Sequence, residues 1–270
     1  TTWQDSSYEY GEHAYSEQEY FLVTTSASGS PKMGTEQITA SSDRSISTSI
    51  QFWVRDSAMV NLVGTGRRWF GELFDFTTQR TYELPMQPTS GGIIKTQATA
   101  VARSSASNTL LRVNGSDQIS FPAVGTASVS HFVTERSLNS TFIAGQNADL
   151  ITLEYDKQGS TGSALWLDYL AVNYETNNSY QAVQRGWQKR FQNFSRGAGN
   201  FSTIEVVGAP ADALVFNVSD PTNVAVVQAQ SAQGTLSWTS DEMATLEYIV
   251  VSPSDALSPI FDAVDQHLIP

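Results

Sequence analysis

The sequence predicts a mainly β protein whose larger part is an antiparallel β-sandwich. Short apolar segments recur along the chain with turn residues between them, and helical signals are scarce. Charged residues make up only 16% of the chain, whereas serine and threonine together number about 60, a composition that suits the hydroxyl-rich surface of extracellular β modules. The sandwich is expected to be of the jelly-roll or galactose-binding-like type.

The strands of the larger part follow from alternation and turn chemistry. Ile46, Thr48, Ile50 and Phe52 share one face of an expected strand, and Asn114-Gly115 is a strong hairpin signal between two others. The segment 165–174 is apolar on both faces, as expected of a strand inside a sandwich. Strands are expected at residues 45–54, 69–76, 80–84, 93–101, 110–113, 118–121, 129–134, 141–144, 150–155 and 165–174.

The composition changes near Asn177, which divides the chain into regions. Residues 1–178 are expected to form the region with the sandwich, 179–200 a polar linker and 201–252 a small β module. Strands of that module are expected at 203–207, 213–218, 224–230, 234–238 and 246–251, separated by turn signals that include Gln233-Gly234. Residues 253–270 read as a helical lead-in to a further domain, with Ser258 as cap and Pro259 in the first helical position.

The linker carries a group of cations whose role the sequence leaves open. They interrupt an otherwise acidic chain, so they could meet an acidic partner surface. They could equally be solvated charges of a linker. The group comprises Arg185, Lys189, Arg190 and Arg196.

Charge and composition exclude several functions. The net charge of −12 disfavours binding nucleic acid through a basic surface. No apolar run approaches the ~18 residues of a membrane helix, so no transmembrane segment is expected. With zero cysteines, these residues hold no disulfide, thiolate metal site or cysteine nucleophile. His13, His131 and His267 show no metal-ligand spacing, and we expect no cofactor or metal.

The segment 64–72 is the densest local motif. Its glycines suggest a phosphate loop, but neither the Gly-Lys-Ser/Thr ending nor a following helix is present. The glycines are expected to form a corner anchored by Trp69 and Phe70, with Arg67 or Arg68 on an aromatic face. The alternative is a contact surface made by Arg67, Arg68 and Trp69.

Trp166 and Asp168 form a second candidate site on the segment 165–174. A tryptophan and a carboxylate can stack on a sugar and accept its hydroxyls, as in ligand-binding sandwiches. Core packing is the alternative, in which case the Asp168 carboxylate must be hydrogen-bonded or lie at an edge. The sequence assigns no catalytic residue.

Four stretches resemble the type IX secretion sortases of the PorU type, which belong to the gingipain-like cysteine peptidases of Bacteroidetes. They occur in a compatible order and extend over most of the chain, although Phe216, Asn217 and Ser219 depart from the family's V(W)DVTDPxNV element. The stretches are NLVGTGRRWFGE at 61–72, HFVTE at 131–135 with WLDYLAVN at 166–173, FNVSDPTNV at 216–224 and YIVV at 248–251.

The resemblance implies the non-catalytic N-terminal region of a larger secreted enzyme. In that family the catalytic cysteine and histidine lie downstream of the region that this chain matches. The full protein acts at the outer-membrane surface, where it removes C-terminal sorting domains from exported cargo. The implied partners are the downstream peptidase domain, outer-membrane secretion components and cargo sorting domains. The implied location is the cell surface or the periplasm.

Two other functions stay open on the residues alone. A sandwich with exposed aromatic rings is a common scaffold for a carbohydrate-binding module, with Trp166 and Asp168, or Arg67 and Trp69, as contacts. A bacterial surface adhesin is the other alternative.

Overall fold

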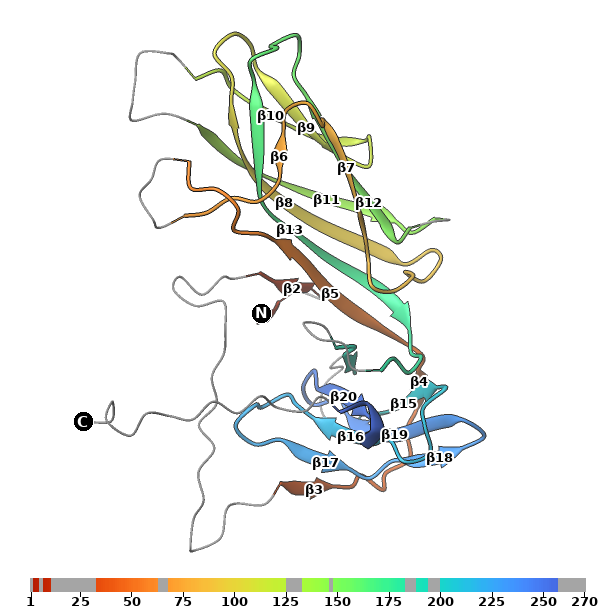
Figure 1. The fold of residues 1–270 in the computed structure, drawn as a ribbon. Coiled ribbons are helices and arrows are strands. Elements are labelled where there is room, and N and C mark those ends of the chain that lie inside the picture. Colours follow the sequence, from red (N-terminus) through yellow and green to blue (C-terminus); the bar gives the residue numbers. More distant parts are fainter. Residues whose placement is uncertain are drawn as a thin grey trace, which may run out of the picture. The chain divides into compact units, whose positions relative to one another are not determined.

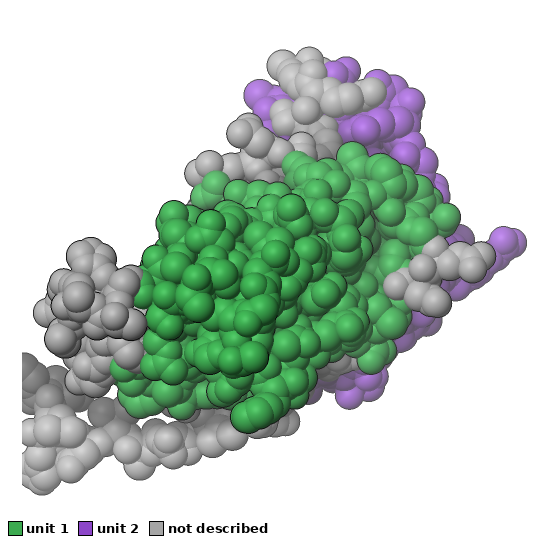
Figure 2. Space-filling model, turned by 90° about the horizontal axis from the view of Figure 1, so that it is seen from above, with its two compact units in different colours: residues 1–30, 48–177 green, residues 31–47, 178–270 purple. Residues whose placement is uncertain are grey.

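The structure is a computed structural model that describes residues 2–4, 7–10, 33–62, 68–124, 133–145, 148–182, 188–193 and 200–256. The chain forms two compact units, one of residues 1–30 with 48–177 and the other of residues 31–47 with 178–270 (Figure 2). The described residues are mainly β, with predominantly antiparallel sheets, which confirms the expected fold class. None of their helical segments could span a bilayer.

The first unit contains a sandwich of two sheets (Figure 1). Sheet I has the strand order β10-β9-β12-β7, and sheet II has the order β11-β8-β13-β5 with β6 paired to β13. The bounds are β5 Thr48–Asp56, β6 Leu73–Phe74, β7 Gln79–Glu83, β8 Ile93–Arg103, β9 Thr109–Val113, β10 Asp117–Phe121, β11 Thr134–Ile143, β12 Leu150–Asp156 and β13 Ala164–Asn177.

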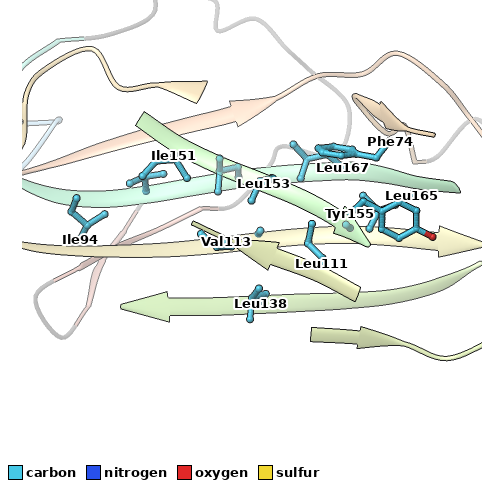
Figure 3. Packing of buried hydrophobic residues seen from close by; sticks show 14 of the residues in the cluster. Phe74, Ile94, Leu111, Val113, Leu138, Ile151, Leu153, Tyr155, Leu165 and Leu167 are labelled. Atoms are coloured by element: carbon cyan, nitrogen blue, oxygen red, sulfur yellow. The ribbon is translucent and has the colours of Figure 1, made fainter. Parts of the chain in front are cut away.

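The core of the first unit lies between these two sheets (Figure 3). Strand alternation directs Leu111 and Val113 of β9 and Leu153 of β12 inward from sheet I, where they meet Leu165 and Leu167 of β13. All five side chains are buried. We therefore call the opposite side of sheet II its outer face.

The Asn-Gly signal was correct. Asn114 and Gly115 both have positive φ, at 48° and 72°, and the Ser116 amide donates a hydrogen bond of 3.2 Å to the Val113 carbonyl. Mirror-image turns of this kind match the twist of the flanking strands, here β9 and β10.

The second unit has two further sheets with the orders β14-β20-β16-β17-β3 and β18-β19-β15-β4. A core that includes Phe191, Ile204, Trp238, Tyr248 and Val250 holds the unit together. The bounds are β3 Gly34–Glu36, β4 Arg44–Ile46, β14 Phe191–Gln192, β15 Phe201–Val207, β16 Leu214–Asn217, β17 Ala225–Val227, β18 Gln230–Ala232, β19 Thr235–Asp241 and β20 Glu247–Val251.

The unit boundaries differ from the expected regions in two places. Residues 31–47 lie in the second unit, because β3 and β4 pair in parallel with β17 and β15. Parallel partners can be far apart in sequence, and no local pattern reports them. The stretch 179–200, expected to be a linker, contributes β14 to a sheet of this unit.

The C-terminal helix is not confirmed. Pro253–Asp255 form a single 3-10 turn after β20, and residues 257–270 lie outside the described residues. Near the other end of the chain, β1 Thr2–Gln4 and β2 Ser7–Glu9 pair as a small antiparallel ribbon.

Candidate interaction site around Arg68

Arg68 bridges two carboxylates that are distant in sequence. Its Nη1 lies 2.5 Å from Oε2 of Glu135, and its Nη2 lies 2.7 Å from Oδ2 of Asp168. The two nitrogens of one planar guanidinium can engage two acceptors at once. Two of the residues singled out in the sequence, Arg68 and Asp168, therefore meet directly in the fold. We call the three residues the Arg68 cluster.

A β-bulge places Asp168 in this cluster. The register between β13 and β8 shifts after Leu167, which pairs with Ala100, because the next pair is Tyr169 with Thr99. Leu165 and Leu167 face the core before the shift, and Leu170 and Val172 face it after the shift. Asp168 is the extra residue of the bulge, and bulges re-aim side chains in this way.

The segment before β6 covers one end of the outer face of sheet II. Val60 and Phe70 form an isolated antiparallel bridge, and both pack on a small cluster that contains Val101 and Trp166. The Arg68 guanidinium carbon lies 5.2 Å from the centroid of the Phe70 ring. The expected aromatic contact of an arginine in this segment is thus present for Arg68. Arg67 lies outside the described residues.

The two tryptophans of the candidate sites have opposite environments. Trp69 is 48% exposed, whereas Trp166 is 8% exposed and has the Arg103 guanidinium carbon 5.7 Å from its ring centroid. Trp166 therefore packs in a small core with Val60 and Phe70, and little of its ring is open to solvent. Trp69 is the accessible ring at this site.

Burial and charge oppose each other at Asp168. Burial raises the pKa of the Asp168 carboxyl above its ordinary value, and the hydrogen bond from Arg68 acts against this rise. The hydrogen bond to Glu135 contributes most to raising the pKa of Arg68, which stays charged. The charged side chains of the Arg68 cluster therefore hold one another in place beside the accessible Trp69 ring. This combination is suited to binding polar groups.

The sequence did not single out Glu135 or Arg103 as members of this site, and it named Phe70 only as an anchor of the corner at 64–72. Glu135 reaches this site through two strand pairings. β11 pairs with β8, which places Glu135 opposite Val101, and β8 pairs with β13, which places Val101 opposite Trp166. Only this cross-strand register brings Glu135, Val101 and Trp166 into one row across the three neighbouring strands β11, β8 and β13.

The cations of the stretch 179–200 do not form a common surface among the described residues. Lys189 is buried, with its Nζ 5.5 Å from the Phe191 ring centroid, and burial lowers its pKa to about 7. Arg190 forms an ion pair with Glu247. Lys189 is therefore neither a solvated linker charge nor a surface contact. Arg185 and Arg196 lie outside the described residues.

Among the described residues, no group of three or more His, Cys, Asp or Glu side chains is placed to hold a metal ion. His13, His131 and His267 lie outside the described residues.

These observations define a two-unit β protein with an antiparallel sandwich and a charge cluster on the outer face of one sheet. No protein-family model and no curated protein matches the chain. Its fold is similar to the crystal structure of dimeric latent PorU from Porphyromonas gingivalis, with a TM-score of 0.65 and 18% identity. The similarity covers 84% of this chain and 22% of the PorU chain, and at this identity it establishes a PorU-like fold.

Proposed function

We propose that this chain is a non-catalytic structural and interaction region of a cell-surface cysteine peptidase of the PorU type. The observation that carries the proposal is the similarity of 84% of the chain to about a fifth of the PorU chain. The 270 residues contain no cysteine, so the nucleophile of such a peptidase would have to lie elsewhere in the polypeptide.

The positions of the family-like stretches support the same proposal. The stretch 61–72 ends in the segment that carries Arg68 and Trp69. The stretch 166–173 lies within β13 and holds the bulge at Asp168. Residues 216–224 span the end of β16 and the turn before β17, and 248–251 lie in β20. The segments that resemble the family thus occupy both units.

The role we propose is recognition through the Arg68 cluster and Trp69. The partner is the downstream peptidase domain, an outer-membrane secretion component or a cargo sorting domain, and the location is the outer-membrane surface. An exposed tryptophan next to a fixed arginine is the combination enriched among residues that dominate interface energies.

The first experiment is to determine the reading frame beyond the codon for Pro270. We expect it to continue into an α/β domain with a cysteine and histidine pair. The 270-residue chain itself should cleave no peptide substrate. A stop codon directly after Pro270 would overturn the proposal.

A second experiment measures recognition in the full-length protein. Trp69→Ala should weaken binding of the isolated peptidase domain or of a cargo sorting domain by about tenfold, because it removes the accessible ring. Phe76→Ala is the matched control, since Phe76 is fully exposed on the turn after β6. Equal effects of the two variants on every partner would exclude this surface as the interface.

The exposure of Trp69 beside the Arg68 cluster also favours a carbohydrate-binding module as a second candidate function. A ring of this kind offers an apolar face to a sugar while neighbouring polar groups bond to its hydroxyls. Calorimetric titration with neutral oligosaccharides tests it. Absence of binding at millimolar concentration would eliminate this candidate.

A further inference from the structure

The outer face of sheet II holds an extended segment from the start of the chain. The Tyr8 amide donates a hydrogen bond of 2.6 Å to Oδ1 of Asn173, and Nδ2 of Asn173 donates one of 2.9 Å to the Tyr8 carbonyl. A side-chain amide has one acceptor and one donor side, so Asn173 pairs with both backbone groups of Tyr8. It contacts the backbone of an extended chain independently of the side chain at that position.

Alternate side chains of the same segment contact the sheet. The Tyr8 ring is buried, with its centroid 5.9 Å from that of Phe52 on β5. The Tyr10 ring lies 4.9 Å from that of Tyr169 on β13, and its hydroxyl donates a hydrogen bond of 2.5 Å to Asp56. Glu9, between the two tyrosines, is exposed. This is the pattern of peptide recognition by backbone pairing and alternate side-chain contacts.

The segment is attached by side chains rather than by a strand ladder. β2 pairs only with β1 among the described strands, although it lies beside β5 and β13 (Figure 1). A two-stranded ribbon of this kind is marginally stable by itself. The contacts that hold it on the sheet include the Asn173 amide, two ring contacts and the Tyr10 hydroxyl. The segment therefore resembles a bound peptide that is covalently linked to the sheet that binds it.

The site extends past the segment. A depression of about 170 Å³ is lined by Ile50, Ile93, Lys95, Asn173 and Glu175, so that Asn173 borders both the depression and Tyr8. Within the described part of the chain, no carboxylate lies within ion-pair distance of Lys95. The lining thus offers apolar contact, the Lys95 cation and the Glu175 carboxylate next to the backbone-binding amide.

We propose that the outer face of β5 and β13 is a binding site for an extended peptide with aromatic side chains at positions i and i+2. Tyr8-Glu9-Tyr10 occupies this site in cis, and a segment of the same chemistry from another polypeptide displaces it. Asn173 binds the backbone at position i, Phe52 and Tyr169 bind the two rings, and Asp56 accepts the hydroxyl of a tyrosine at i+2. The proposal goes beyond the proposed function and does not depend on it.

The experiment empties the site in the full chain and refills it in trans. The receptor is the double variant Tyr8→Ala with Tyr10→Ala, and the probe is a fluorescent synthetic peptide of residues 1–12. We expect this variant to bind the peptide about tenfold more tightly than the wild-type chain, because the cis occupant competes in the latter. Adding Asn173→Ala to the variant should abolish binding. Glu9→Ala is the matched control and should leave the wild-type affinity unchanged.

A measurement on the unmodified chain covers the case in which the double variant does not fold. Excess peptide should increase amide hydrogen exchange at residues 7–10 of the wild-type chain while β13 stays protected. A peptide with both tyrosines replaced by alanine should have no effect. Two outcomes would overturn the proposal: no change in exchange at residues 7–10, or binding to the folded double variant that survives Asn173→Ala. Residues 7–10 of a second copy of the chain could also displace the bound segment, which would appear as concentration-dependent dimers. This outcome would support the same site chemistry.

Discussion

Arg44 and Glu242 form an ion pair across 198 positions of sequence, with 2.7 Å between Nε of Arg44 and Oε1 of Glu242. The Glu242 side chain is fully buried, and 29% of the Arg44 side chain is exposed. The pair joins β4 to the residue that follows β19, and so fixes the segment 31–47 to the second unit. The boundary between the units is thus maintained by contacts that are remote in sequence.

Removing this arginine should destabilise the second unit selectively. Arg44→Ala leaves the buried Glu242 carboxylate without this cation, and we expect a loss of about 3 kcal/mol in the free energy of unfolding. Hydrogen exchange should quicken in β15 and β19, while β8 and β13 keep their protection. Equal loosening of all four strands would contradict the assignment of β4 to the second unit.

A second prediction about stability concerns the Arg68 cluster. Arg68→Ala leaves the mostly buried Asp168 carboxylate without its ion pair, and the variant should lose about 1–2 kcal/mol by denaturant unfolding. Arg112 is the matched control because it also joins two carboxylates, Glu154 and Asp156, and both of these are more exposed than Asp168. Arg112→Ala should cost less than about 1 kcal/mol. Equal costs would show that the burial of Asp168 is not decisive.

Gly115 tests the hairpin between β9 and β10. A Cβ at this position would meet no atom within 4 Å, so the penalty of Gly115→Ala comes only from its φ of +72°. We expect a loss of about 1 kcal/mol in unfolding free energy. Gly145 also has open space around it but no positive φ, and Gly145→Ala should change stability by less than about 0.5 kcal/mol. A reversed order would refute the backbone explanation.

Lys189 gives a prediction about pH. Its pKa falls to about 7 in the folded chain from an ordinary value of 10.5 because the ammonium is buried. Between these values the unfolded chain binds more protons, so this residue makes the free energy of unfolding increase with pH from about 7 to 10. Lys189→Met should therefore be more stable than the wild type at pH 6, by about 2 kcal/mol.

Urea unfolding of both chains at pH 6, 8 and 9.5 checks the sign. The advantage of Lys189→Met should shrink as the pH rises, because the wild-type lysine then becomes neutral in the folded chain. An advantage that is constant over this range would show that the pKa of Lys189 does not change on folding, so that its ammonium is adequately solvated in the folded chain.

Local chemistry accounts for the elements that were predicted correctly. Alternation of side chains gave the position of β8, apolar residues on both faces gave that of β13, and the Asn-Gly pair gave the hairpin at 114–115. The predicted strand at 69–76 shortened to Leu73–Phe74, because Phe70 pairs with Val60 in an isolated bridge. The continuous strand expected at 45–54 divides at Ser47, where the chain passes from the second unit to the first.

By itself, the sequence determined the fold class, because period-2 alternation and turn residues act over a few positions and can be read locally. It also singled out Arg68, Trp69 and Asp168 as candidate contact residues. The tertiary structure alone decided that Asp168 lies on a bulge, that Glu135 joins it at Arg68, that Trp166 is buried while Trp69 is exposed, and that residues 31–47 belong to the second unit. Each of these depends on strand pairing over long sequence separations, and the partners in such pairings are selected by the packing of whole sheets rather than by any local pattern.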